Sequence, residues 1–189
     1  LLNSVYDVEA NFFGGQNQNF SELLADNLIL PANNDDYQQI WRRGTNFFNG
    51  TVQGVYGDAY IAIYRANVVM QAMNTISMSE LSKKRFEGEA KFIRAFNHFA
   101  IVRQFAQPYD NTTANTQNGI GIKTSTSFDP VTRSSVNDVY VQIVADLKSA
   151  EALLPEDNGV YANAFAAKAL LAKVYLEMGD WQNAYDYAD

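Results

Sequence analysis

An all-α fold, an antiparallel helical bundle with tetratricopeptide-like helix pairs and long loops, is predicted by three features of the sequence. Residues 86–105 carry apolar side chains on nearly every face, contain no proline, and are long enough for about five helical turns. Residues 135–154 follow the three-four spacing of an amphipathic helix. Near the end of the chain, Ala172, Tyr175, Gly179 and Ala184 fall at the spacings of a tetratricopeptide repeat.

Segment 86–105 is expected to lie at the centre of this bundle. A surface helix normally shows one apolar stripe, so a helix that is apolar nearly all round is buried between neighbours. Arg94, His98 and Arg103 interrupt the apolar pattern, and each then needs a partner because an unpaired buried charge is costly. Arg94 and Asp146 are expected to form an ion pair, with capping of a helix end as the alternative for Arg94. His98 is interpreted as a satisfied core histidine rather than a catalytic or metal-binding one.

The composition excludes several functional classes. A hydrophobic content of 47% argues against disorder, and a net charge of -7 argues against a nucleic-acid-binding surface. The absence of cysteine removes disulfides, thiolate metal sites and a cysteine nucleophile. No metal or cofactor is predicted. The basic cluster at residues 83–85 is interpreted as a solvated helix start, with a phosphate or lipid-headgroup patch as the alternative.

Before the central segment, helices are expected at 1–13, 20–30 and 58–74. Gly14 and Gly15 would end the first helix; Ser21 would lie near the start of the second, and Pro31 would end it. Residues 31–54 are expected to form a long loop. The pair at residues 35–36 is interpreted as a turn or a helix cap, since it does not fit a calcium-binding loop.

In the second half, Asn163 is expected to cap a helix at 164–178 that stops at Gly179, and Trp181 begins another. Segment 86–105 with 135–154 would form one repeat with a long insertion, followed by a second repeat. We therefore expect a single domain over 1–189, divided into 1–57, 58–134 and 135–189. The chain begins and stops within helical patterns, so we expect it to be part of a longer protein.

Four segments together resemble the SusD/RagB family of outer-membrane lipoproteins. They are Tyr64-Arg-Ala-Asn67, the run Glu89–Phe96 continuing to Pro108, the region from Asp146 to Pro155, and Ala166–Leu176 with Gly179-Asp180-Trp181. The resemblance covers residues 58–189. His98 and Ala106 depart from the family pattern, which has Tyr and Gly there, and both are conservative for packing.

The resemblance implies a non-catalytic receptor that binds glycans at the cell surface for uptake by a SusC-like TonB-dependent transporter. It also implies a surface-exposed outer-membrane lipoprotein, whose lipidated N-terminal Cys is not in this sequence. One alternative is an oligopeptide-binding, RagB-like receptor, and another is a tetratricopeptide scaffold that binds proteins. A helical glycoside hydrolase is a further alternative, which would require two carboxylates facing each other across a cleft.

One stretch has the composition of a sugar-binding surface. Aromatic rings stack on the apolar faces of pyranose rings, and Asn and Arg side chains bond hydroxyl groups. The candidate ligand-binding residues are Tyr37, Trp41, Arg42, Arg43, Asn46 and Asn49, with Phe47 and Phe48 between them. The alternative is that these aromatic residues pin a long loop to the helices. Arg94, His98, Asp146, Tyr175, Gly179 and Trp181 are assigned structural roles.

Overall fold

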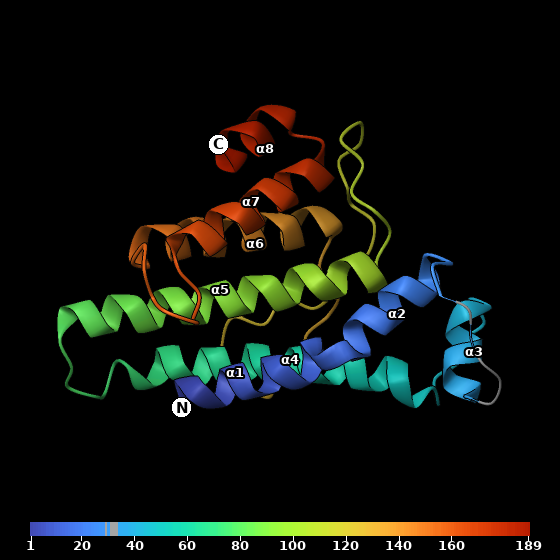
Figure 1. Ribbon diagram of the computed structural model, residues 1–189, viewed down its shortest axis with the longest axis horizontal. Helices are drawn as coiled ribbons and strands as arrows, with labels where there is room; N and C mark the ends of the chain where they lie inside the picture. The colour runs from blue at the N-terminus through green and yellow to red at the C-terminus, as the bar shows by residue number, and fades with distance from the viewer. Residues whose placement is uncertain (29, 31–33) are drawn as a thin grey trace.

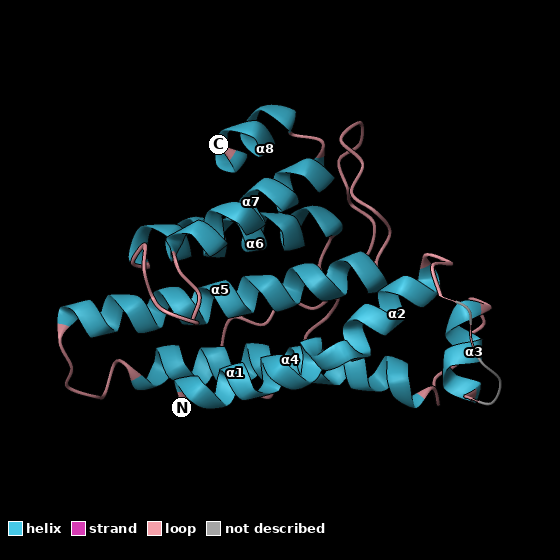
Figure 2. Ribbon diagram, in the orientation of Figure 1, coloured by secondary structure: helices cyan, strands magenta, loops and turns pink. Residues whose placement is uncertain are grey.

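The chain folds as a stack of helices joined by loops, as the computed structural model describes it for residues 1–28, 30 and 34–189 (Figures 1 and 2). Within these residues, strand-like pairing is limited to a single bridge between Asn118 and Ser135. The all-α prediction is therefore confirmed. The helices are α1 (Leu2–Asn11), α2 (Asn17–Leu24), α3 (Asp35–Trp41), α4 (Gly50–Ala72), α5 (Glu80–Phe105), α6 (Val136–Leu153), α7 (Ala164–Met178) and α8 (Trp181–Ala188).

Helix α5 runs through the middle of the stack. Helices α1 and α4 lie on one side of it, and α6, α7 and α8 follow in order on the other, each antiparallel to the one before (Figure 1). None of the helices in the described ranges is both long and apolar enough to cross a membrane. Helices α2 and α3 lie beside the start of α4, so the α3–α4 connection sits at one end of the stack.

The central position of α5 follows from its all-round burial. Ile93, Phe99 and Ile101 are each at most 2% exposed, although they point in different directions around the helix. Phe92 and Phe96 are half-buried, and their rings stack with centroids 5.8 Å apart. Apolar surface removed from water on several sides stabilises the helix through its neighbours rather than through intrinsic propensity.

The boundaries of α5, α6 and α7 are set by local polar contacts. The side chains of Ser79, Ser135 and Asn163 accept hydrogen bonds from the backbone N–H groups three residues later, which satisfies otherwise unpaired donors of the first turn. Gly179 ends α7 in the left-handed conformation, with φ of 72°. The cap predicted at Asn163 is thus confirmed, and Ser79 and Ser135 cap α5 and α6 in the same way.

The second helix differs from its prediction. Gly14 and Gly15 interrupt the first helix as predicted, since both have non-helical backbone angles and Gly15 has a φ of 122°, but α2 starts directly after this kink, at Asn17, rather than at residue 20. Ser21 consequently lies inside α2, where its hydroxyl accepts a hydrogen bond from Gln104. Helix α2 ends at Leu24, earlier than residue 30, and Pro31 lies outside the described residues.

The expected loop at 31–54 is also corrected. Its middle forms α3, which Asn34 caps by accepting a hydrogen bond from the N–H of Tyr37. The acidic pair at 35–36 occupies the first turn of α3. There its negative charge interacts favourably with the positive end of the helix dipole. Helix α4 begins at Gly50, well before residue 58, because Asn49 caps it. The glycines in its first turns have low helix propensity, so propensity alone does not predict this start.

A buried carboxyl group lies between α1 and α5. Glu9 accepts a hydrogen bond from the side-chain amide of Asn97, and burial raises the pKa of Glu9 from 4.5 to about 7. Glu9 Oε2 and Asn97 Oδ1 are buried acceptors without a partner in the described part of the chain. A proton on Glu9 removes the charge from this apolar surrounding, which explains the direction of the pKa shift.

Stability is therefore expected to fall as pH rises from about 4.5 to about 7, and to level off above that range. Between these two pKa values the unfolded chain has released the proton that the folded chain still holds. The variant Glu9→Gln should lose this component of the pH dependence, as measured by denaturant unfolding from pH 4.5 to 8. Parallel profiles for the two proteins would contradict the assignment.

Candidate functional site

The α3–α4 connection, residues 42–49, is held in a defined turn. Arg43 adopts the left-handed conformation with φ of 53°, and its N–H donates to the carbonyl of Ile40. The guanidinium of Arg43 donates to the carbonyl of Leu24 and to Asp26, at 3.0 and 2.8 Å, which ties the turn to the end of α2. The side chain of Asn46 accepts from the N–H of Phe48 at 2.8 Å.

This turn presents aromatic rings to solvent. Phe47 and Phe48 are 82% and 85% exposed, and their rings meet edge to face with centroids 5.6 Å apart. Trp41, at the end of α3, is 43% exposed. Tyr37 is half-buried and packs against the core. The alternative role, pinning the loop to the helices, therefore holds for Tyr37 but not for the two phenylalanines. We call Trp41, Phe47 and Phe48 the aromatic surface.

The polar candidates divide into accessible and inaccessible groups. Asn49 is fully buried: its Oδ1 accepts from the N–H of Val52, and its Nδ2 donates to the carbonyl of Asp36. The expectation that Asn49 contacts a ligand is corrected on this ground. Arg42 and Asn46 are exposed beside the aromatic surface, as is Arg43 with its ion pair to Asp26.

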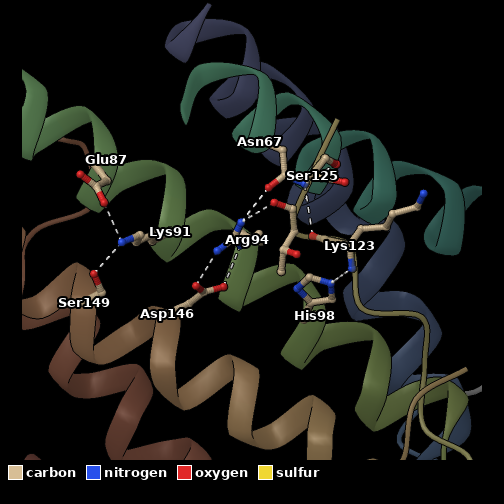
Figure 3. Close-up of polar contacts among 10 residues, drawn as sticks. Asn67, Glu87, Lys91, Arg94, His98, Lys123, Ser125, Asp146 and Ser149 are labelled. Atoms are coloured by element: carbon tan, nitrogen blue, oxygen red, sulfur yellow. Dashed lines mark hydrogen bonds and ion pairs between the residues drawn. The ribbon is translucent and has the colours of Figure 1, made fainter. Parts of the chain in front are cut away.

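A second, buried polar cluster joins α4, α5 and α6 in the middle of the stack (Figure 3). Arg94 of α5 donates two hydrogen bonds to Asp146 of α6, at 2.8 and 2.7 Å, and both side chains are less than 10% exposed. The same guanidinium donates to Asn67 of α4 at 2.8 Å. The ion pair proposed from the sequence is formed, and Arg94 does not cap a helix end.

The cluster also fixes the loop that follows α5. The amide of Asn67 donates to the carbonyls of Lys123 and Ser125, at 3.2 and 3.1 Å (Figure 3). His98 accepts a hydrogen bond from the N–H of Lys123 through Nε2. Burial lowers the pKa of His98 to about 4, so the ring is neutral at ordinary pH and can accept this bond. His98 thus lies in the core, and this bond satisfies its Nε2.

The remaining residues assigned structural roles lie in the last two helices. Tyr175 is 5% exposed and stacks on Tyr187 with centroids 5.6 Å apart, which joins α7 to α8. Gly179 makes the turn between them, and a Cβ there would also clash with the Asn111 side chain. Trp181 begins α8 but is 65% exposed, so its ring does not join the core in this structure.

Sequence reasoning missed a further group of aromatic side chains. Tyr56, Tyr60 and Tyr64 recur every four residues along α4, and Phe128 approaches them from the loop after α5. The spacing of the tyrosines was available as a signal, but Phe128 lies in a polar stretch that gave no pattern. Among the described residues, no group of three His, Asp or Glu side chains is placed to hold a metal ion.

Comparisons with known proteins agree on one family. The profile of the SusD-like family described as "Starch-binding associating with outer membrane" matches residues 1–176. SusD-like protein P2 of Formosa agariphila is 30% identical over 145 residues, covering 74% of this chain and 27% of that protein.

Solved structures extend the similarity to nearly the whole chain. A SusD superfamily protein from Bacteroides thetaiotaomicron superposes with a TM-score of 0.86 and 27% identity, covering 99% of this chain and 43% of the other. A laminarin-binding SusD-like protein gives 0.81 and 26%, covering 98% and 41%. The chain thus spans less than half the length of these relatives. It belongs to the SusD-like family of carbohydrate-binding proteins associated with the outer membrane.

Proposed function

We propose that this protein is a non-catalytic cell-surface receptor that binds glycans through the aromatic surface at the α3–α4 turn. The observation that carries the proposal is the exposure of Phe47 and Phe48 on a hydrogen-bonded turn. Large apolar rings held in solvent contribute little to folding, and they offer flat faces to the C–H groups of a sugar ring. The family and its laminarin-binding member support the ligand class.

Exposed hydrogen-bonding side chains lie next to the rings in the chain and favour reversible capture. Asn46 and Arg42 can bond sugar hydroxyls at the edge of the surface. Two of the nearby carboxylates serve the fold, since Asp26 pairs with Arg43 and Asp36 accepts from the N–H of Thr51. This arrangement supports binding over the carboxylate-pair chemistry of a glycoside hydrolase.

The proposal has two further parts. The protein delivers the bound glycan to a SusC-like TonB-dependent transporter, and it is attached to the outer membrane by a lipidated N-terminal Cys. Family membership supports both. Leu176, Trp181 and Tyr185 of α7 and α8 are more than half exposed and supply apolar area of the kind found at protein interfaces. This surface also accommodates the scaffold role of tetratricopeptide repeats, because a receptor that delivers a ligand must bind its transporter.

The test is the binding of starch and of laminarin to the full chain, by calorimetry and by retardation in polysaccharide-containing gels. The double variant Phe47→Ala with Phe48→Ala is expected to weaken binding by about tenfold, because two stacking contacts of roughly 0.5–1.5 kcal/mol are removed. No new reducing ends should accumulate.

The matched control is Leu81→Ala, which removes another exposed apolar side chain, at the start of α5. It should bind as the wild type does. Equal binding by the double variant and the wild type, or turnover of the polysaccharide, would refute the proposed function.

A further inference from the structure

A groove of about 520 Å³ runs along α4 on the side covered by the loop after α5. We call it the α4 groove. Its volume falls in the range of small-ligand sites. One wall is the tyrosine row of α4, and the other is formed by loop residues 121–131. The side chains that line it include Tyr56, Tyr60, Tyr64, Lys123, Phe128 and Asp129.

The tyrosine row is a consequence of helical spacing. Residues four apart lie on the same face of a helix, so Tyr56, Tyr60 and Tyr64 form one line. Tyr60 is locked in place because its hydroxyl donates to the carbonyl of Gly121 at 2.7 Å. Tyr56 and Tyr64 remain 37% and 36% exposed, and the Tyr64 hydroxyl has no hydrogen-bond partner within the described residues. The row therefore offers both ring surface and free hydrogen-bonding capacity.

The opposite wall of the groove carries the ring of Phe128, which is too exposed to contribute much to folding. Phe128 is 87% exposed, and its ring lies 5.3 Å from that of Tyr64. Its loop is ordered by contacts on both sides: Asn67 binds the carbonyls of Lys123 and Ser125, and the Lys123 amine donates to the carbonyls of Ser127 and Asp129. An exposed ring on an ordered loop is prepared for a ligand, because little conformational freedom remains to be lost on binding.

The charges of the groove indicate what kind of ligand fits. Lys123 is its cation, and its amine already donates to two carbonyls. Asp129 is its anion, and its carboxylate accepts from the hydroxyl of Ser127. With one charge of each sign, the groove has no surplus that would select an ionic ligand. Aromatic faces combined with hydroxyl and carboxylate groups suit a neutral, hydroxyl-rich ring.

We propose that the α4 groove is a second glycan site, which binds a neutral pyranose segment between the tyrosine row and Phe128. This inference rests on the proposed function, since it assigns the same ligand class to a separate place. Tyr56 lies seven residues after the Asn49 cap, or about 10 Å along the helix. Both sites are thus mounted on one rigid helix, and a polysaccharide that engages both would be held by avidity.

The experiment is hydroxyl-radical footprinting of the full chain with and without laminarin, and separately with and without starch. Phe128 and Tyr64 should be modified in the free protein and protected by at least one polysaccharide. Phe128→Ala should weaken binding of that polysaccharide by about fivefold to tenfold. It should leave the protection of Trp41, Phe47 and Phe48 unchanged at saturating polysaccharide. Leu81→Ala is again the control.

The outcomes separate the two proposals. Protection of the aromatic surface without protection of Phe128 and Tyr64 would overturn the second site and leave the proposed function standing. Protection of Phe128 in the protein without polysaccharide would also overturn the second site, because another part of the protein would then occupy the groove. Absence of any polysaccharide binding would overturn both.

Discussion

Replacing Arg94 with methionine is expected to lower the free energy of unfolding by about 3–5 kcal/mol. The guanidinium bonds Asp146 twice and Asn67 once, and all three side chains are buried. Methionine fills much of the same volume but leaves the Asp146 carboxylate without its counter-charge in an apolar interior. Chemical denaturation of the wild type and the variant at neutral pH measures the loss.

Two further variants separate charge pairing from packing. Arg103→Met removes the ion pair with Glu177, which is partly exposed, and should cost less than about 1 kcal/mol. The double variant Arg94→Met with Asp146→Leu should recover part of the stability lost, because no isolated charge remains buried. An unchanged midpoint for Arg94→Met would show that the ion pair does not stabilise the fold.

Replacing Gly88 with alanine is expected to destabilise the protein by about 1–3 kcal/mol through overpacking. Helix α5 meets the end of α6 closely at this position: an added Cβ would lie 2.8 Å from Leu154 Cγ and 3.1 Å from Leu153 Cβ. Helix propensity alone predicts the opposite sign, since alanine is favoured over glycine inside a helix. Thermal and denaturant unfolding of the variant therefore test which effect dominates.

Gly57→Ala is the matched control. Gly57 also lies inside a helix, α4, but an added Cβ there would meet no atom within 4 Å. This variant should stabilise the protein by up to about 1 kcal/mol. The same sign of change at both positions would contradict the packing argument for Gly88.

The central helix could be predicted because its signals are local and agree with one another. Residues 86–105 are apolar on all sides, and Pro108 follows the end of the helix. Ser135 and Asn163 mark helix starts by side-chain chemistry that acts over three residues. Such elements are specified by neighbouring residues, so a single sequence contains the information needed to find them.

The start of α4 could not be predicted because it depends on tertiary contacts. Gly50, Gly54 and Gly57 each disfavour a helix by propensity, yet all three are helical here. Gly54 lies against the side chain of Gln16, from a distant turn, where a Cβ would come within 2.7 Å of Nε2. A close approach between distant segments leaves no periodic trace in the sequence.

The candidate site was predictable in composition but not in detail. The density of aromatic and amide side chains marked residues 37–49, and the structure shows that Phe47 and Phe48 face solvent. Asparagine serves equally well as a helix cap and as a sugar ligand, so only the buried position of Asn49 distinguishes these roles. Phe128 and Tyr64 are far apart in the sequence but pack together in the structure, and analysis of local patterns does not detect such a contact.

The buried Asn49 amide has an evolutionary consequence. It fixes the start of α4 and the backbone of α3, while Phe47 and Phe48 next to it in the chain are more than 80% exposed. Substitutions at Phe47 and Phe48 are therefore expected to leave the frame undisturbed. Under the proposed function, ligand preference can then change one exposed position at a time, while the Asn49 cap stays constant.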